Sequence, residues 1–207
     1  MKRLLVVGAG GHGAVVADAA LSTGDWGTVA FVDDRAAELV TPLGLEVVGT
    51  TKELPGLVGQ YDAAVVAIGD ADIRLRVLEA CGKLRFLLPV IAHRSSVISP
   101  FATLSPGCVV FAQAVVNPGA RLGRACIVNT AASIDHDCEL DDGVHVCPGA
   151  HLAGNVRVGA STWIGIGAVV REGITVGNNV VVAAGSVVVK DVECNVTVMG
   201  VPARRRM

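Results

Sequence analysis

An aliphatic side chain stands at every sixth position through the second half of the chain. The series runs without interruption over sixteen positions, from Ile98 to Val188. Four positions after most of these residues the side chain is small, as at Cys108 and Ala114. Self-similarity at a fixed short period is the signature of a solenoid, in which every repeat forms one structural unit. The pattern predicts stacked hexapeptides whose inward-facing residues are Ile98, Leu104, Val110, Val116, Leu122, Val128, Ile134, Leu140, Val146, Leu152, Val158, Ile164, Val170, Val176, Val182 and Val188.

Three such hexapeptides are expected to form one triangular turn. Successive turns then stack as parallel strands about 4.8 Å apart, so that residues 18 apart in the sequence lie above one another. Glycine follows the aliphatic residue at Gly123, Gly159, Gly165 and Gly177. We expect these glycines to relieve the tight corners, because glycine tolerates positive φ. An ordinary β-sandwich would instead show alternation with a period of two and clusters of turn residues.

The polar segment Asp135-His136-Asp137 interrupts the apolar repeat at an outward-facing position. A carboxylate beside a histidine fixes the tautomer of the imidazole and raises its pKa, which suits a general base. An exposed histidine without a catalytic role is the alternative. His145 follows nine residues later, half a turn away, and His151 comes after it.

The N-terminal segment has a different pattern. Residues 3–7 predict a buried strand, the loop 8–13 reads GAGGHG and leads into a helix, and a second strand at 29–32 ends in Asp33 and Asp34. This is the dinucleotide-binding fingerprint with an acid about 20 residues further on. The glycines let the backbone approach a diphosphate at the helix N-terminus, and the acid can accept a hydrogen bond from a ribose hydroxyl.

Only about 90 residues precede the repeat, roughly half of a full dinucleotide-binding domain. A unit of this size suits one nucleotide, such as the diphosphate of a nucleotide-sugar, better than NAD. A third strand at 63–68 is followed by Gly69 and Asp70, which would add polar backbone at the same edge of the sheet.

Composition excludes several classes of protein. The 207 residues are 52% hydrophobic but only 3% aromatic, as expected for a narrow aliphatic interior, and the net charge of −2 argues against nucleic-acid binding. No apolar run is long enough for a membrane span, and the N-terminus lacks the cleavage site of a signal peptide. The six cysteines form no CxxC pair, so we expect small core residues in a reducing cytoplasm and no metal site.

Six segments, in this order and spacing, resemble the hexapeptide-repeat nucleotide-sugar N-acetyltransferases of bacterial glycan biosynthesis. That family includes enzymes of the bacillosamine and perosamine pathways and is related to sialic-acid O-acetyltransferases. The segments are GAGGHG (8–13), FVDD (31–34), AIGD with the following IR (67–74), SIDHDC (133–138), GVHVCPGAHLAGNV (143–156) and GVPA (200–203).

The resemblance implies an α/β, Rossmann-like half-domain that binds a nucleotide-sugar over residues 1–92. A left-handed parallel β-helix, the acyltransferase domain, would follow over residues 93–207. It implies transfer of acetyl from acetyl-CoA to an amino group, the 4-amino group, of a nucleotide-linked deoxyamino sugar. The resemblance also implies a homotrimer in which the coenzyme lies between neighbouring prisms. Transfer to a sugar hydroxyl, as in the sialic-acid type, is the alternative function.

The resemblance also assigns roles position by position. His136 matches the general base, and Asp137 matches the acid that increases its basicity. The positions that match acetyl-CoA contacts are His145, Gly154, Ile166 and Ala184. Those that match the nucleotide-sugar site are Gly10, Gly11, His12, Asp33, Asp34 and Gly69.

Two further classes are open on the residues alone. A prism-shaped zinc hydrolyase would need converging histidines, for which His136, His145 and His151 are the candidates, but their spacing differs from that pattern. A sugar-nucleotide sensor would use only the N-terminal domain, and the His136-Asp137 pair argues against it.

Overall fold

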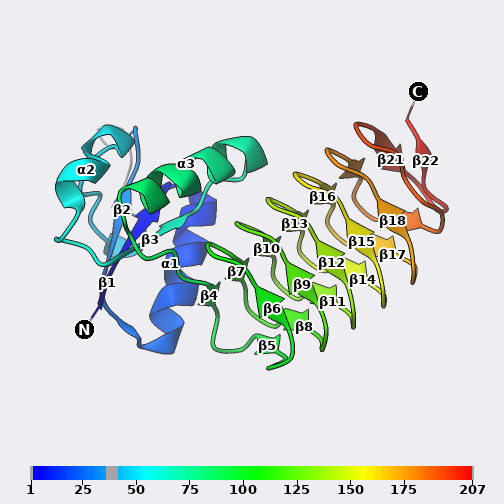
Figure 1. The fold of residues 1–207 in the computed structure, drawn as a ribbon, viewed down its shortest axis with the longest axis horizontal. Helices are drawn as coiled ribbons and strands as arrows, with labels where there is room; N and C mark the ends of the chain where they lie inside the picture. Colours follow the sequence, from blue (N-terminus) through cyan, green and yellow to red (C-terminus); the bar gives the residue numbers. More distant parts are fainter. Residues whose placement is uncertain (1, 36–41, 207) are drawn as a thin grey trace.

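A computed structural model describes residues 2–35 and 42–206, which form a small α/β part at one end of a long prism (Figure 1). The α/β part has a parallel sheet with strand order β2-β1-β3. The strands are β1 (Lys2–Val7), β2 (Trp26–Val32) and β3 (Ala63–Val66). Their apolar residues are buried, as expected for a parallel sheet covered on both faces.

Two 13-residue helices cover this sheet, α1 (Gly11–Thr23) and α3 (Ala71–Lys83). A side chain at Gly13 would collide with the carbonyl oxygen of Gly8, so glycine is what lets α1 start so close to β1. Between β2 and β3 lie the short helical segments Pro42–Gly44, Thr51–Glu53 and α2 (Leu54–Leu57).

The prism has three faces, each a stack of short strands that run parallel except at the last strand of one face. The docked face, which contacts the α/β part, contains β4 (Ile91–Ala92), β7 (Val109–Val110), β10 (Ile127–Val128), β13 (His145–Val146), β16 (Trp163–Ile164), β19 (Val181–Val182), β21 (Thr197–Met199) and the antiparallel β22 (Arg204–Arg205). The valine face contains β5 (Val97–Ile98), β8 (Val115–Val116), β11 (Ser133–Ile134), β14 (His151–Leu152), β17 (Val169–Val170) and β20 (Val187–Val188). The charged face contains β6 (Thr103–Leu104), β9 (Arg121–Leu122), β12 (Glu139–Leu140), β15 (Arg157–Val158) and β18 (Thr175–Val176).

The register confirms the predicted parallel β-helix. Residues 18 apart pair from β4 to β20, for example Val128 with Val146, and the last turn is two residues shorter, so that Val181 pairs with Thr197. Of the sixteen predicted inward residues, fourteen are buried, and Ile98 and Leu104 at the open end are half-buried against the same core. The coil begins at β4, one hexapeptide before the first predicted position, so the predicted domain boundary after residue 92 falls at the end of its first strand.

The corners differ from the expectation. Every sixth residue from Gly107 to Gly185 has a φ between 53° and 77°, but these residues stand three positions after the aliphatic one. The glycines that follow the aliphatic residue directly have ordinary φ values, and a side chain there would meet the next turn; a Cβ on Gly165 would lie 2.5 Å from the Val182 carbonyl oxygen. Close stacking, not backbone conformation, therefore requires glycine at those positions.

The two parts share one core. Phe111 and Ile127 on the docked face are buried in the same cluster as Val16 of α1 and Leu4 of β1. Figure 1 shows the α/β part beside the first turns, with the later turns extending away from it toward the C-terminus. None of the helices in the described ranges reaches the length and hydrophobicity that crossing a bilayer requires.

A matched pair of substitutions on β12 tests the inward frame. Leu140→Asp places an unpaired charge inside the prism and is expected to lower the free energy of unfolding by several kcal/mol. Glu139→Asp, the outward neighbour, shortens only exposed ion pairs and is expected to cost less than about 1 kcal/mol. Urea denaturation measures both. Equal losses would contradict the frame.

Candidate active site

His136 lies on the edge between the valine face and the charged face, which we call the dyad edge. It stands in the turn between β11 and β12, and its Nδ1 is 2.9 Å from Oδ2 of Asp137. The backbone of this turn is held by Asp135, whose Oδ1 accepts hydrogen bonds from the His136 N–H at 2.8 Å and from Nδ2 of Asn117 at 3.0 Å. The turn therefore fixes the histidine and its carboxylate relative to each other.

Two glycines of neighbouring turns make room for this pair. A Cβ on Gly154, one turn above, would lie 2.5 Å from Nε2 of His136. A Cβ on Gly119, one turn below, would collide with Oδ1 of Asp137. The imidazole of His136 therefore lies directly against the backbone of Gly154, with no side chain between them. Within the described chain the Gly154 N–H makes no hydrogen bond, so it is available as a donor.

The electrostatics of the dyad favour a basic imidazole. The hydrogen bond to Asp137 raises the pKa of His136, and the negative charges of Asp135 and Asp137 act in the same direction. More than half of each side chain of the dyad is exposed, so a substrate can reach it. Asp137 itself occupies a corner position with φ 57°, a conformation that Asp tolerates better than most residues.

His145 lies on the docked face, opposite the dyad edge. It is 6% exposed and packs against Trp163, with ring centroids 4.3 Å apart. Oδ1 of Asn129 accepts the Thr130 N–H at 2.8 Å, which turns Nδ2 of Asn129 toward Nε2 of His145 at 3.1 Å. Nε2 of His145 is therefore an acceptor, and the neutral imidazole carries its proton on Nδ1.

Two buried histidine nitrogens have no hydrogen-bond partner in the described residues, Nδ1 of His145 and Nε2 of His12. The two rings face each other across the junction of the domains, with centroids 6.3 Å apart. Burial and the nearby Arg74 guanidinium lower the pKa of His12 to about 4. Burial, Arg74 and His12 lower the pKa of His145 to about 3. Both imidazoles are neutral at physiological pH.

A hollow of about 590 Å³ opens between the start of α3 and the docked face. Its lining includes Gly69 from the α/β part, His145 and Trp163 from the prism, and Arg74. Gly69 and His145 were predicted to serve two different substrates, and the fold brings them into one hollow. Trp163 was not among the predicted site residues, although it stands out in the sequence as an aromatic residue at an outward position of an aromatic-poor repeat.

The carboxyl edge of the sheet holds four of the other predicted nucleotide-sugar residues, Gly10, Gly11, Asp33 and Asp34, whereas His12 faces His145 at the junction of the domains. Gly10 is the N-cap of α1 and provides no side-chain cap, and Gly11 begins the helix. Oδ2 of Asp33 accepts the Ala9 N–H at 2.8 Å, and Asp33 also binds Arg35. Asp34 accepts from both the N–H and the hydroxyl of Thr51, at 2.8 and 2.7 Å. Asp33 thus holds the glycine loop at Ala9, and Asp34 holds the segment at Thr51.

The predicted coenzyme residues do not gather in one protomer. Gly154 lies on the dyad edge with His136, whereas Ile166 and Ala184 stack on the edge between the docked face and the valine face. His145 lies on the docked face itself. The three histidines considered as zinc ligands also lie on different sides, and the described residues contain no group of three metal-ligating side chains.

Comparison with known proteins finds relatives of both parts of the chain. Residues 3–81 match the family described as PglD N-terminal domain, and residues 155–190 match the bacterial transferase hexapeptide (six repeats). The acetyltransferase domain of PglB from Neisseria gonorrhoeae, solved with acetyl coenzyme A, is 45% identical, with a TM-score of 0.95 over 99% of each chain. PerB from Caulobacter crescentus, solved with CoA and GDP-perosamine, is 36% identical, with a TM-score of 0.95 over 100% of this chain and 98% of that one.

Two curated relatives differ in how much they share. The GDP-perosamine N-acetyltransferase of Escherichia coli is 32% identical over 183 residues, 84% of this chain and 80% of that protein. The galactoside O-acetyltransferase of Escherichia coli is 45% identical over only 49 residues, so the match spans 24% of its length.

The fold and the dyad edge define a left-handed β-helix acyltransferase with an α/β domain at its start. The chain belongs to the hexapeptide-repeat nucleotide-sugar N-acetyltransferase family, which confirms the resemblance inferred from the six sequence segments.

The buried histidines predict how stability depends on pH. Their folded pKa values of about 4 and about 3 lie below the ordinary 6.5, so the unfolded chain binds more protons below pH 6.5. The stabilisation is complete above pH 6.5 and falls by about 1.4 kcal/mol per pH unit for each histidine as the pH drops toward the folded pKa. The pKa of His136 is raised, so its contribution to stability has the opposite pH dependence. That contribution is present below pH 6.5 and is lost as the pH rises through the folded pKa.

Urea denaturation between pH 7 and pH 5 measures this slope, and His12→Gln is expected to reduce it by about half. A free energy of unfolding that stays constant from pH 6.5 to pH 5 would contradict the neutral buried pair.

Proposed function

We propose that the protein transfers acetyl from acetyl-CoA to the 4-amino group of a nucleotide-linked deoxyamino sugar, with His136 as the general base. The hollow lined by both Gly69 and His145 carries this proposal, because a nucleotide-sugar bound at the sheet edge would extend its sugar into it. The solved relatives that bind acetyl coenzyme A, or CoA and GDP-perosamine, support the same pair of substrates.

The chemistry follows from the dyad. An amine that attacks a thioester carbonyl must lose a proton as the new C–N bond forms, and Nε2 of His136 is free to accept it. Asp137 stabilises the imidazolium that results, through the 2.9 Å contact at Nδ1. The C–S bond of the thioester then breaks, and the CoA thiolate leaves with the proton that the imidazolium returns. The Gly154 N–H, which has no acceptor of its own in the described chain, suits the developing oxyanion.

The opposite placement of the dyad and the hollow favours a homotrimer. The dyad edge is separated from the docked face by the full width of the prism, so His136 cannot reach the hollow of its own protomer. A neighbouring subunit can supply it. The outward column of the valine face supports this packing, because it includes the exposed apolar residues Val97 and Val169, whereas the charged face presents the Arg121–Glu139 ion pair to solvent.

A panel of UDP- and GDP-linked amino sugars, assayed with acetyl-CoA for release of free thiol, tests the function. Each amino sugar is paired with the corresponding hydroxyl sugar. The proposal requires turnover with at least one amine acceptor and faster turnover than with its hydroxyl partner. Turnover with hydroxyl sugars alone would establish the O-acetyltransferase alternative, and no turnover with any member would leave the proposal without support.

With the active acceptor, His136→Ala is expected to lower kcat by about 10²–10⁴-fold, because the proton acceptor is lost. The Kd for acetyl-CoA should change little. Asp137→Asn is expected to cost less and to move the acidic limb of the pH–rate profile downward, because the pKa of His136 loses the interaction that raises it. If His136→Ala kept more than about a third of the wild-type kcat, His136 would not be the base.

Mixed trimers test the shared site. His136→Ala removes the dyad, and Gly10→Val blocks approach of a diphosphate to the glycine loop. Each variant alone is expected to be nearly inactive. Co-refolded in equal amounts, about a quarter of the subunit pairs combine an intact dyad with an intact nucleotide site, so about a quarter of wild-type activity should return. A site built within one protomer would give no recovery.

A further inference from the structure

Arg74 is a buried cation on the first turns of α3. Its side chain is 1% exposed, and no carboxylate in residues 2–35 and 42–206 forms an ion pair with it. Taking a guanidinium out of water without a counter-ion is costly, so its hydrogen bonds must compensate for the lost solvation. The groups that accept these hydrogen bonds therefore indicate the role of Arg74.

All of these hydrogen bonds go to backbone carbonyl oxygens, and they come from both parts of the protein. Nη1 donates to Ile68 at 2.8 Å and to Gly69 at 2.7 Å, in the loop between β3 and α3. Nε donates to Ala125 at 2.9 Å and Nη2 to Gly143 at 2.7 Å, in the prism. One rigid side chain thus joins the predicted nucleotide-sugar loop to two turns of the β-helix.

The prism side of this contact is unusually well defined. Ala125 and Gly143 stand one above the other on the edge between the charged face and the docked face, both in the left-handed conformation, with φ 53° and 73°. Ala125 is also buried against Val66 and Leu78 of the α/β part. The stacked corners therefore fix the directions of the two carbonyl oxygens that accept hydrogen bonds from Arg74, because neither corner moves without the other.

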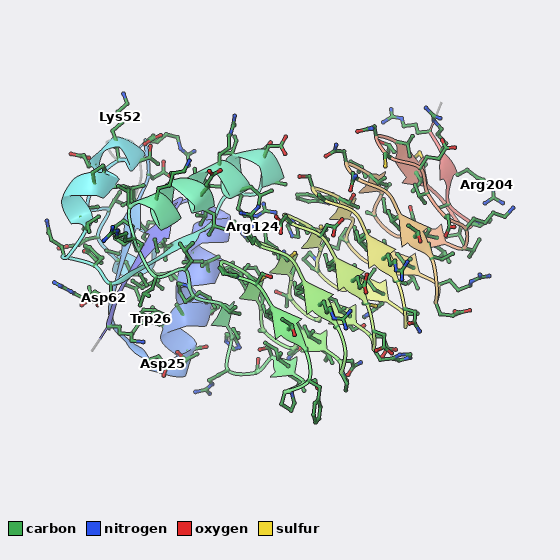
Figure 2. All side chains as sticks on the ribbon, in the orientation of Figure 1. Asp25, Trp26, Lys52, Asp62, Arg124 and Arg204 are labelled. Atoms are coloured by element: carbon green, nitrogen blue, oxygen red, sulfur yellow. The ribbon has the colours of Figure 1, made fainter. Side chains whose placement is uncertain are left out.

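Other polar contacts near this edge are too exposed to set the alignment. The Ser161 hydroxyl contacts Asp72 across the junction at 3.3 Å, and the Arg124–Asp142 ion pair lies within the prism. Figure 2 shows Arg124 close to α3, where the prism begins. Exposed pairs of this kind contribute little.

We propose that Arg74 is a positioning residue, which holds the nucleotide-sugar loop at Gly69 in register with the prism wall that carries His145. The proposal rests on the proposed function, because register matters only if the sugar bound at one part reacts at the other. A lysine cannot replace it: the guanidinium is a planar fork with five N–H donors, whereas an ammonium offers three donors from a single point.

Arg74→Lys in the full-length protein tests this, with Arg76→Lys as the matched control, since Arg76 is exposed on the same helix. The Kd values for acetyl-CoA and for UDP or GDP should stay within about threefold of wild type, because each part keeps its own contacts. The kcat should fall by about 10–100-fold, because small misplacements of bound reactants are costly. Arg76→Lys should change none of these. If Arg74→Lys does not fold, Arg74→Gln removes the buried charge and serves instead.

A folded Arg74 variant with kcat within threefold of wild type would overturn the proposal. So would a loss of nucleotide affinity in proportion to kcat, which would indicate a ligand contact and not alignment. Amide hydrogen exchange separates this from failure of the proposed function. In an Arg74 variant, exchange should increase together at 67–74 and at the prism corners 124–126 and 142–144, even if no acceptor sugar is turned over. An increase on one side only would refute the link.

Discussion

The whole structure depends on burying one aliphatic side chain per hexapeptide in the narrow interior of the prism, where side chains from all three faces pack together. Each turn then rests on the one before it, because its strands pair with residues 18 positions away through main-chain hydrogen bonds that join residues 17 or 19 apart. Val128 cannot shift relative to Val146 without moving the turns above and below. This rigidity allows an exposed loop residue such as His136 to be held as firmly as a side chain on a long strand.

The proposed catalytic residues lie on an edge of the prism and not on a face, for a steric reason. On a face, outward side chains of successive turns stand directly above one another, as Arg121, Glu139 and Arg157 do in their exposed ion pairs. At the dyad edge, Gly119 and Gly154 remove the neighbours that would crowd His136 and Asp137. The imidazole gains an open approach while its carboxylate partner stays fixed.

The docked face imposes the opposite environment. There the α/β part covers the prism, and the imidazole of His145 is a neutral hydrogen-bond donor, whereas the imidazole of His136 at the dyad edge is suited to act as a base. Asn129 locates the proton of His145, and burial and Arg74 suppress the charge of that imidazole. Two histidines nine residues apart thus have pKa values displaced in opposite directions, because half a turn of the coil separates solvent from the junction of the domains.

The sequence by itself determined the β-helix, its inward frame, the strand–loop–helix that opens the chain and the adjacency of His136 and Asp137. These features depend on a strict period or on neighbouring residues, so local chemistry specifies them. Tertiary structure alone decided which face the α/β part covers, that Gly69 and His145 share a hollow, and that Arg74 joins residues 51 and 69 positions away. Those contacts arise where the surfaces of the two parts meet, and no periodicity in the chain encodes the way one surface packs against another.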